Sequence, residues 1–240
     1  MKRVSLRLLL ACTMAGTLVS AQAPTPYKLG TFERNSRTFV GIVLRESLVI
    51  DFAAAHAAIP SPTLTLTMPV DMKDLIVRYD TGLRARIVEI VSSVEAAGAT
   101  PPPYAYPLAA VKILPPIMYP TTMLNVAVNY AAHDAEMASL RDQVPGAGPA
   151  TAGAALAGTV SAPGIWERSQ SDGRWNPYVF IKLPAAIIAD GEAIRLPPGR
   201  ERVDWECELG LVIGRPATRV SVAEADDYGF GYTIANDVAD

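Results

Sequence analysis

Residues 203–214 have the sequence VDWECELGLVIG. Its second part is an apolar run of β-forming residues that Gly214 closes, which predicts a β-strand. Successive side chains on a strand point to opposite faces, so Glu206 and Glu208 share one face and Cys207 lies on the other. The sequence therefore brings two carboxylates to one place and predicts a thiol buried on the inner face of the strand.

Two adjacent carboxylates at the start of an apolar strand repel each other unless a cation lies between them. A hard divalent ion is the expected partner. Oxygen ligands favour Mg²⁺, Mn²⁺ or Ca²⁺ over zinc, because Cys207 faces away and neither histidine is near in sequence. For an isolated Glu-x-Glu, the alternative is an edge strand whose acidic face is simply solvated.

The composition predicts a folded chain with a sizeable core, since 50% of its 240 residues are hydrophobic and 19% are charged. The net charge is only -3, and no basic stripe with interleaved aromatic residues is present. Nucleic acid is therefore excluded as an expected partner. Two cysteines do not make a disulfide framework.

The N-terminus has the organisation of an export signal. Lys2 and Arg3 follow the initiator methionine, residues 8–19 form a mainly apolar stretch, and small residues precede Pro24. We expect residues 1–23 to be a signal peptide and the protein to be periplasmic or extracellular. The apolar run is shorter than the roughly 20 residues that a spanning helix needs. Lipoprotein anchoring at Cys12 is the alternative.

After the signal, the pattern predicts a small, partly open β barrel with helices, residues 24–105. His56 lies in an alanine-rich segment without a neighbouring ligand type, which indicates a structural role. The prolines at 101–103 predict a linker and a boundary near residue 105, so that residues 106–240 form a second domain. The expected strands are 28–32, 38–43 and 47–51, and the expected helices are 52–59, 71–79 and 82–97.

In the second domain, a strand at 123–130 is predicted to pass into a short helix at 131–137. Residues three apart on a helix share a face, so His133 and Glu136 can meet. A carboxylate beside an imidazole orients it and makes it a better general base. The alternative is an exposed helical turn with ordinary polar residues.

The rest of the domain alternates loops and strands. Residues 143–166 are rich in Gly, Ala, Pro and Thr, which predicts a surface loop or lid. A strand at 175–182 ends in Lys182, which is either an anion-binding group or a surface lysine. A short helix at 221–227 precedes a glycine-punctuated strand at 228–235, after which Asp237 is a candidate third oxygen ligand.

The order and spacing of five motifs resemble the fumarylacetoacetate hydrolase family over about residues 110 to 240. The N-terminal module is also similar to the small β domain that precedes the catalytic domain in many members. The motifs are Asn129-Tyr130-x-x-His133-x-x-Glu136, Phe180-x-Lys182, Glu206-x-Glu208-Leu209, Gly231-Tyr232 and Asn236-Asp237-Val238.

The resemblance implies a mainly β fold, in which the small barrel is followed by a mixed β-roll catalytic domain, and a homodimer. It implies that a divalent cation, Mg²⁺ first and Mn²⁺ or Ca²⁺ as alternatives, is held by Glu206, Glu208 and Asp237. It also implies that His133 and Glu136 activate water or relay protons. Lys182 would contact a substrate carboxylate.

Family likeness also implies the chemistry. The expected reaction is hydrolysis of a carbon–carbon bond in a 1,3-dicarbonyl or 2-oxo acid, such as an acylpyruvate or a compound like fumarylacetoacetate. Oxaloacetate decarboxylation and dienoate isomerisation are alternatives within the family. A non-catalytic metal-binding β module and an inactive fragment are alternatives outside this chemistry.

Three features depart from the family pattern. Ala127 stands where the family usually has glycine, and the segment 143–166 is a long insert. The chain ends at Asp240, whereas the family continues through an arginine and further strands that include a catalytic lysine. We therefore expect a truncated chain with an incomplete sheet and exposed strand edges.

Overall fold

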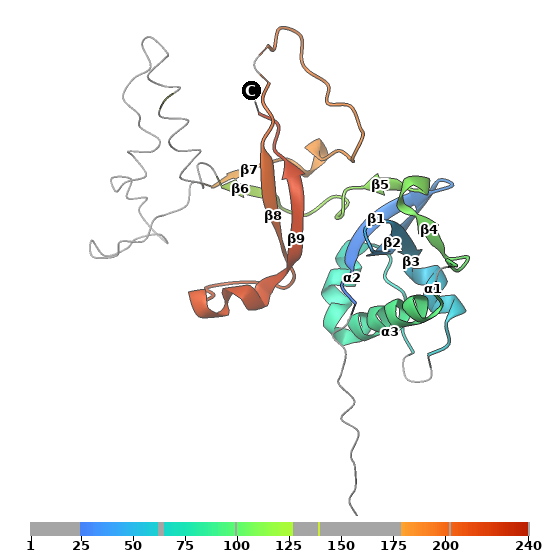
Figure 1. The fold of residues 1–240 in the computed structure, drawn as a ribbon. Helices are drawn as coiled ribbons and strands as arrows, with labels where there is room; N and C mark the ends of the chain where they lie inside the picture. Colours follow the sequence, from blue (N-terminus) through green and yellow to red (C-terminus); the bar gives the residue numbers. More distant parts are fainter. Residues whose placement is uncertain are drawn as a thin grey trace, which may run out of the picture.

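A five-stranded antiparallel sheet organises the N-terminal half of the computed structural model (Figure 1). The structure describes residues 25–61, 65–98, 100–126, 139, 179–201 and 203–239. The strand order is β4-β3-β2-β1-β5. The strands are β1 Lys28–Arg34, β2 Arg37–Leu44, β3 Leu48–Asp51, β4 Ala105–Pro107 and β5 Lys112–Leu114.

A two-residue turn sets the register between β1 and β2. Asn35 and Ser36 both have positive φ, 51° and 59°, and Arg34 pairs with Arg37 across the turn. Positive φ at both central residues is the geometry that matches the right-handed twist of a hairpin, and asparagine tolerates it well. The two central residues therefore close a tight hairpin between β1 and β2.

Three α-helices accompany this sheet, at the positions that the sequence predicts. They are α1 Phe52–Ala58, α2 Met72–Arg78 and α3 Leu83–Ala96, and Figure 1 shows α1 and α3 on one side of the strands. The first two begin at aspartates. Asp51 accepts a hydrogen bond from the Ala54 amide at 3.1 Å, and Asp71 accepts one from the Asp74 amide at 2.8 Å. These are favourable N-caps.

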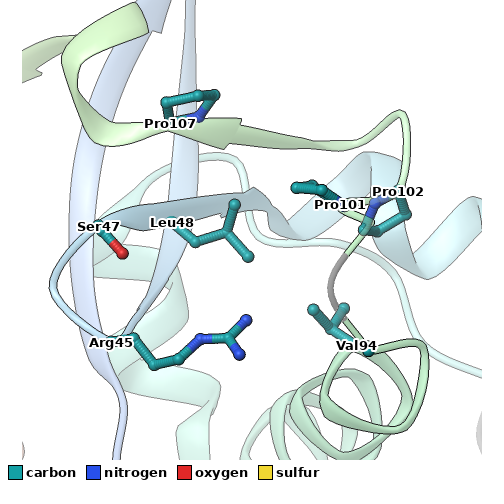
Figure 2. Close-up of a pocket in the computed structure, with 8 residues that line it drawn as sticks. Arg45, Ser47, Leu48, Val94, Pro101, Pro102 and Pro107 are labelled. Atoms are coloured by element: carbon teal, nitrogen blue, oxygen red, sulfur yellow. The ribbon is translucent and has the colours of Figure 1, made fainter.

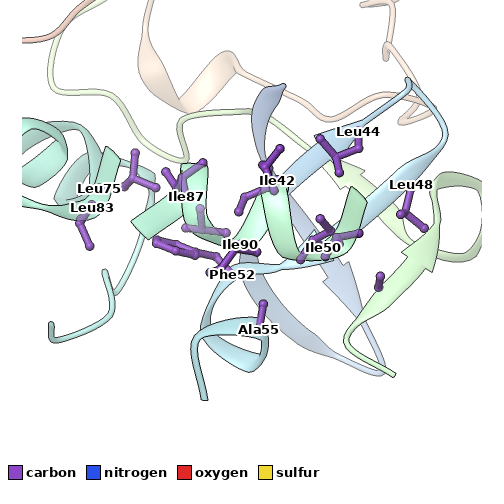
Figure 3. Close-up of a cluster of buried hydrophobic side chains, with 14 of the residues drawn as sticks. Ile42, Leu44, Leu48, Ile50, Phe52, Ala55, Leu75, Leu83, Ile87 and Ile90 are labelled. Carbon is purple, nitrogen blue, oxygen red and sulfur yellow. The ribbon is translucent and has the colours of Figure 1, made fainter. Parts of the chain in front are cut away.

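The core lies between the helices and the sheet (Figure 3). α3 contributes apolar residues at helical spacing, which turns one of its faces toward the strands. The strands contribute alternate residues. The fully buried aliphatic members are Ile42, Leu44, Ile50, Leu75, Leu83, Ile87 and Ile90.

A buried arginine joins α1 to α3. Arg86 is 1% exposed, and its Nε donates to His56 Nδ1 at 2.9 Å while Nη1 donates to Glu89 Oε2 at 2.7 Å. Its Nη2 also donates to the backbone oxygens of His56 and Ile59. His56 therefore has the structural role that the sequence predicts.

The C-terminal half contains two strand pairs. β6 Leu124–Val126 pairs with β7 Val179–Ile181, and β8 Cys207–Ile213 pairs with β9 Gly229–Asn236. β6, β7 and β8 fall within the predicted ranges, and β9 ends one residue beyond its predicted range. The segment before β9, predicted to be a short helix at 221–227, is a 3₁₀ helix, η4 Val222–Tyr228. Three shorter 3₁₀ helices are η1 Tyr79–Thr81, η2 Leu108–Ala110 and η3 Pro184–Ala186.

The described residues thus form a β-rich α+β fold, as expected. The domain boundary near residue 105 stays a prediction, although β4 and β5, which lie at and beyond it, pair with the N-terminal sheet. Among the described residues, no helix is both long enough and apolar enough to span a bilayer.

The environment of Cys207 differs from the prediction. The thiol was expected on a buried inner face, but Cys207 is exposed. The same face carries Leu209, Leu211 and Ile213, which are 58%, 53% and 56% exposed. Strand alternation correctly separates this face from the two glutamates, but apolar composition does not establish which face is covered.

Core packing against α2 predicts a large stability difference between two residues of one helix. Leu75 is fully buried, whereas Val77 is 76% exposed. Leu75→Ala should lower the free energy of unfolding by about 2–5 kcal/mol, because it leaves a cavity. Val77→Ala should change it by less than about 0.5 kcal/mol. Urea denaturation followed by circular dichroism measures both, and equal losses would contradict the described core.

The Arg86–His56 contact predicts a pH dependence of stability. Burial, followed by the positive charge of Arg86, lowers the pKa of His56, and Glu89 partly offsets this. The unfolded chain then binds a proton more readily than the folded chain once the pH falls below about 6.5. Stability should therefore decrease below that pH.

His56→Gln is the matched control, since glutamine can accept the Arg86 hydrogen bond without titrating. We expect the wild type to lose more stability than His56→Gln between pH 7.5 and 5.5 in urea titrations. An identical loss in both proteins would exclude His56 as the source.

Candidate metal centre

The β8–β9 hairpin brings three carboxylates together at one end. Cys207 on β8 pairs with Asn236 on β9. The strands are antiparallel, so Glu206, which precedes Cys207, lies opposite Asp237, which follows Asn236. The Asp237 amide donates to the Glu206 carbonyl at 2.9 Å, which holds this arrangement. Glu208 is on the same face two residues along, at the diagonal distance that long side chains can bridge.

The side chains converge as this register requires. One carboxylate oxygen from each of Glu206, Glu208 and Asp237 lies within 4.8 Å of the others. Asp237 is buried, while both glutamates are partly exposed. The structure therefore brings together the three acidic residues that the sequence singles out.

Repulsion within the cluster is visible in the pKa of Glu208. Burial raises this pKa first, and the charges of Asp237 and Glu206 raise it further, while Lys182 lowers it. The ionised form of Glu208 is thus disfavoured when only protein groups surround it. A bound cation would reverse that balance.

Lys182 lies against the cluster, one residue after β7. Its Nζ is 2.5 Å from Asp237 Oδ1 and donates to the Val238 carbonyl at 3.2 Å. The structure therefore gives this lysine a carboxylate partner within the protein. The predicted contact with a substrate carboxylate stays a prediction.

Asn125 is a member of the site that the sequence analysis missed. This β6 residue is 6% exposed, and its Nδ2 lies 3.1 Å from Glu208 Oε2 and 2.6 Å from Asp237 Oδ2. The available signal was an amide side chain inside an otherwise apolar short strand, between Leu124 and Val126. Such a residue needs polar partners when buried.

The donor set fits a hard divalent cation. Three carboxylates provide only oxygen ligands, the type that Mg²⁺, Mn²⁺ and Ca²⁺ prefer. The exposed Cys207 is on the opposite face of the strand from the cluster. His133 and Glu136 lie outside the described residues, so their role as a dyad stays a prediction.

A second surface feature is separate from this cluster. Figure 2 shows a groove in the N-terminal half where the Arg45 side chain lies near Leu48 and Val94. Prolines 101, 102 and 107 form much of its remaining wall. The groove is lined by residues of the β2–β3 turn, α3 and the following loop, and it does not include the acidic cluster.

The family model for the fumarylacetoacetate (FAA) hydrolase C-terminal domain matches residues 122–240. Residues 122–240 belong to the fumarylacetoacetate hydrolase family. The matched region contains every residue of the acidic cluster and both residues that support it, Asn125 and Lys182.

Individual relatives extend the likeness into the N-terminal half. Oxaloacetate tautomerase YisK of Bacillus subtilis is 25% identical over 213 residues, which cover 88% of this chain and 60% of that protein. This chain therefore spans less than two thirds of the relative's length.

Two solved structures share the fold. One is maleylpyruvate hydrolase from Sphingobium in complex with manganese(II) and pyruvate, with a TM-score of 0.52 at 21% identity, covering 88% of this chain and 58% of that one. The other is fumarylacetoacetate hydrolase from Exiguobacterium antarcticum, with a TM-score of 0.51 at 22% identity, covering 89% and 56%.

The repulsion at Glu208 predicts opposite effects of one substitution with and without metal. In EDTA, Glu208→Gln should raise the melting temperature by a few degrees near neutral pH, because glutamine removes one of the repelling charges. With excess Mn²⁺, the wild type should gain more in melting temperature than the variant, because the variant has lost a ligand.

The direction in which stability changes with pH follows from the raised pKa of Glu208. The folded chain binds this proton more tightly than the unfolded chain, so the stability contribution is present at low pH and lost as the pH rises through the folded pKa. Thermal melts in EDTA at several pH values check this. A Glu208→Gln variant that is less stable than the wild type in metal-free buffer at neutral pH would contradict the described repulsion.

Proposed function

We propose that this chain carries the metal-binding part of an enzyme that acts on 1,3-dicarbonyl or 2-oxo acids and hydrolyses a carbon–carbon bond in them. The observation that carries the proposal is the meeting of Glu206, Glu208 and Asp237 at one end of the β8–β9 hairpin. Family membership supports the chemistry, as does a solved structure of the same fold that is a maleylpyruvate hydrolase.

A second candidate is interconversion of the keto and enol forms of oxaloacetate. It is favoured by the similarity to oxaloacetate tautomerase YisK, which covers 88% of this chain. Both candidates need a site that binds a 2-oxo acid and stabilises negative charge on its oxo oxygen. Oxaloacetate decarboxylation and dienoate isomerisation require the same kind of site.

The proposed cation is Mg²⁺, with Mn²⁺ and Ca²⁺ as alternatives, and its ligands would be Glu206, Glu208 and Asp237. When bound, a divalent ion supplies Lewis-acid stabilisation of a developing oxyanion. Manganese in the maleylpyruvate hydrolase structure supports a divalent metal in this fold. Lys182 already lies beside Asp237 and would balance part of the negative charge or contact a substrate carboxylate.

The proposed proton-transfer groups are His133 and Glu136. An imidazole oriented by a carboxylate removes a proton from water or substrate near neutral pH. This assignment rests on the family motif. We further propose, from the family likeness, that the enzyme is a homodimer. From the signal pattern, we propose that residues 1–23 direct export to the periplasm or to the outside of the cell.

Substitutions separate metal binding from proton transfer. Glu206→Gln and Glu208→Gln should abolish both Mn²⁺ binding and turnover, because each removes a ligand. His133→Ala should keep Mn²⁺ binding and lose turnover by about 10²–10⁴-fold, the usual contribution of a general base. Glu201→Gln is the matched control, since this exposed glutamate lies close in sequence but outside the cluster.

The measurements are calorimetric titration with Mn²⁺ and assays with an acylpyruvate and with oxaloacetate. Pyruvate released from the acylpyruvate indicates hydrolysis, whereas a change in enol absorbance alone indicates tautomerisation. Full activity in His133→Ala would reject the dyad. A chain that binds Mn²⁺ at the cluster but acts on neither compound would favour a non-catalytic metal-binding module.

A further inference from the structure

Asn125 is placed to control the geometry of the acidic cluster. It is the central residue of β6, where Leu124 and Val126 are 58% and 38% exposed but Asn125 is 6% exposed. Strand alternation explains the difference, because Asn125 points to the opposite face from its two neighbours. That face meets the β8–β9 hairpin, whose carboxylates are 83 and 112 residues away in sequence.

The Asn125 amide links carboxylates from two different strands. Its Nδ2 lies within hydrogen-bond distance of both Glu208 Oε2, at 3.1 Å, and Asp237 Oδ2, at 2.6 Å. An NH₂ group has two hydrogens and donates one to each acceptor, whereas the amide oxygen has none to give. The side chain therefore fixes the separation of Glu208 and Asp237 by direct contact with both.

A neutral donor suits this position better than a second cation would. The three carboxylates and the ammonium of Lys182, in their usual charged forms, leave a formal charge of -2. That charge matches one divalent ion. Asn125 eases the repulsion between Glu208 and Asp237 without neutralising either of them, and each carboxylate keeps its charge for a metal.

We propose that Asn125 is a positioning residue that pre-organises Glu208 and Asp237 for a divalent cation, an inference that rests on the metal-dependent function proposed above. Without the amide, the two carboxylates separate, and a cation must bring them back together as it binds. Residues that hydrogen-bond to metal ligands typically contribute about 10–100-fold to metal affinity. Asn125 contributes an effect of that size.

The test is calorimetric titration of the full chain with Mn²⁺, supported by electron paramagnetic resonance of the unbound ion. Asn125→Leu has a similar size and no hydrogen to donate, so Mn²⁺ affinity should fall about 10–100-fold. Asn125→Ser has a single hydroxyl hydrogen and cannot serve both carboxylates, so its affinity should fall less. Leu124→Ala, on the opposite face of the same strand, is the matched control and should bind as the wild type does.

Circular dichroism and thermal melts accompany each titration, and Asn125→Ser provides the test if Asn125→Leu does not fold. If the Asn125 variants lose thermal stability but keep the wild-type Mn²⁺ dissociation constant, the role of Asn125 is structural only. That result would overturn the inference and leave the proposed function intact. If the wild type binds no Mn²⁺, the proposed function fails and the inference fails with it. The inference is supported if Mn²⁺ affinity falls in Asn125→Ser, falls further in Asn125→Leu, and is unchanged in Leu124→Ala.

Discussion

The three carboxylates of the site repel one another, and the fold must hold them together against this repulsion. Three carboxylates meet within 4.8 Å, and burial, followed by the charges of Asp237 and Glu206, raises the pKa of Glu208. The protein keeps them together through covalent and backbone geometry. Adjacent strands of one hairpin carry them, and the Asp237 amide binds the Glu206 carbonyl.

Two side chains from other strands complete this arrangement. Asn125 on β6 donates to two of the carboxylates, and Lys182 after β7 pairs with the most buried one, Asp237. The β6–β7 pair thus supplies the positive and hydrogen-bonding side of the site, while β8 and β9 supply its negative side. The excess of negative charge that remains is the physical basis for expecting a divalent ion.

The N-terminal half contacts the hairpin through aromatic side chains. Phe230 on β9 meets Tyr79 edge to face, with ring centroids 5.0 Å apart. The Tyr79 hydroxyl lies 2.6 Å from that of Tyr27, just before β1. Burial is the first cause of the raised pKa of Tyr27, and Tyr27, Tyr79 and Phe230 all pack, partly buried, against the N-terminal core. The N-terminal half therefore contacts the hairpin at its connected end, opposite the end that carries the acidic cluster.

Local sequence patterns predicted much of this fold. Strands β1 to β3 and helices α1 to α3 follow from alternation and 3.6-residue spacing, whereas β4 and β5 were not predicted. The shared face of Glu206 and Glu208 follows from strand geometry alone. Asn125 could not be found in this way, because its partners lie 83 and 112 residues away and only tertiary packing brings them close. The pairing of Lys182 with Asp237 and the exposure of Cys207 are tertiary properties of the same kind.

Binding of one divalent ion among these three carboxylates can be observed by anomalous X-ray scattering at the manganese edge, from crystals of this chain grown with Mn²⁺. A divalent ion bound at the acidic cluster should give a single strong peak about 2 Å from oxygens of Glu206, Glu208 and Asp237. A map without a peak at that position, or with manganese held only elsewhere on the chain, would contradict binding at the cluster.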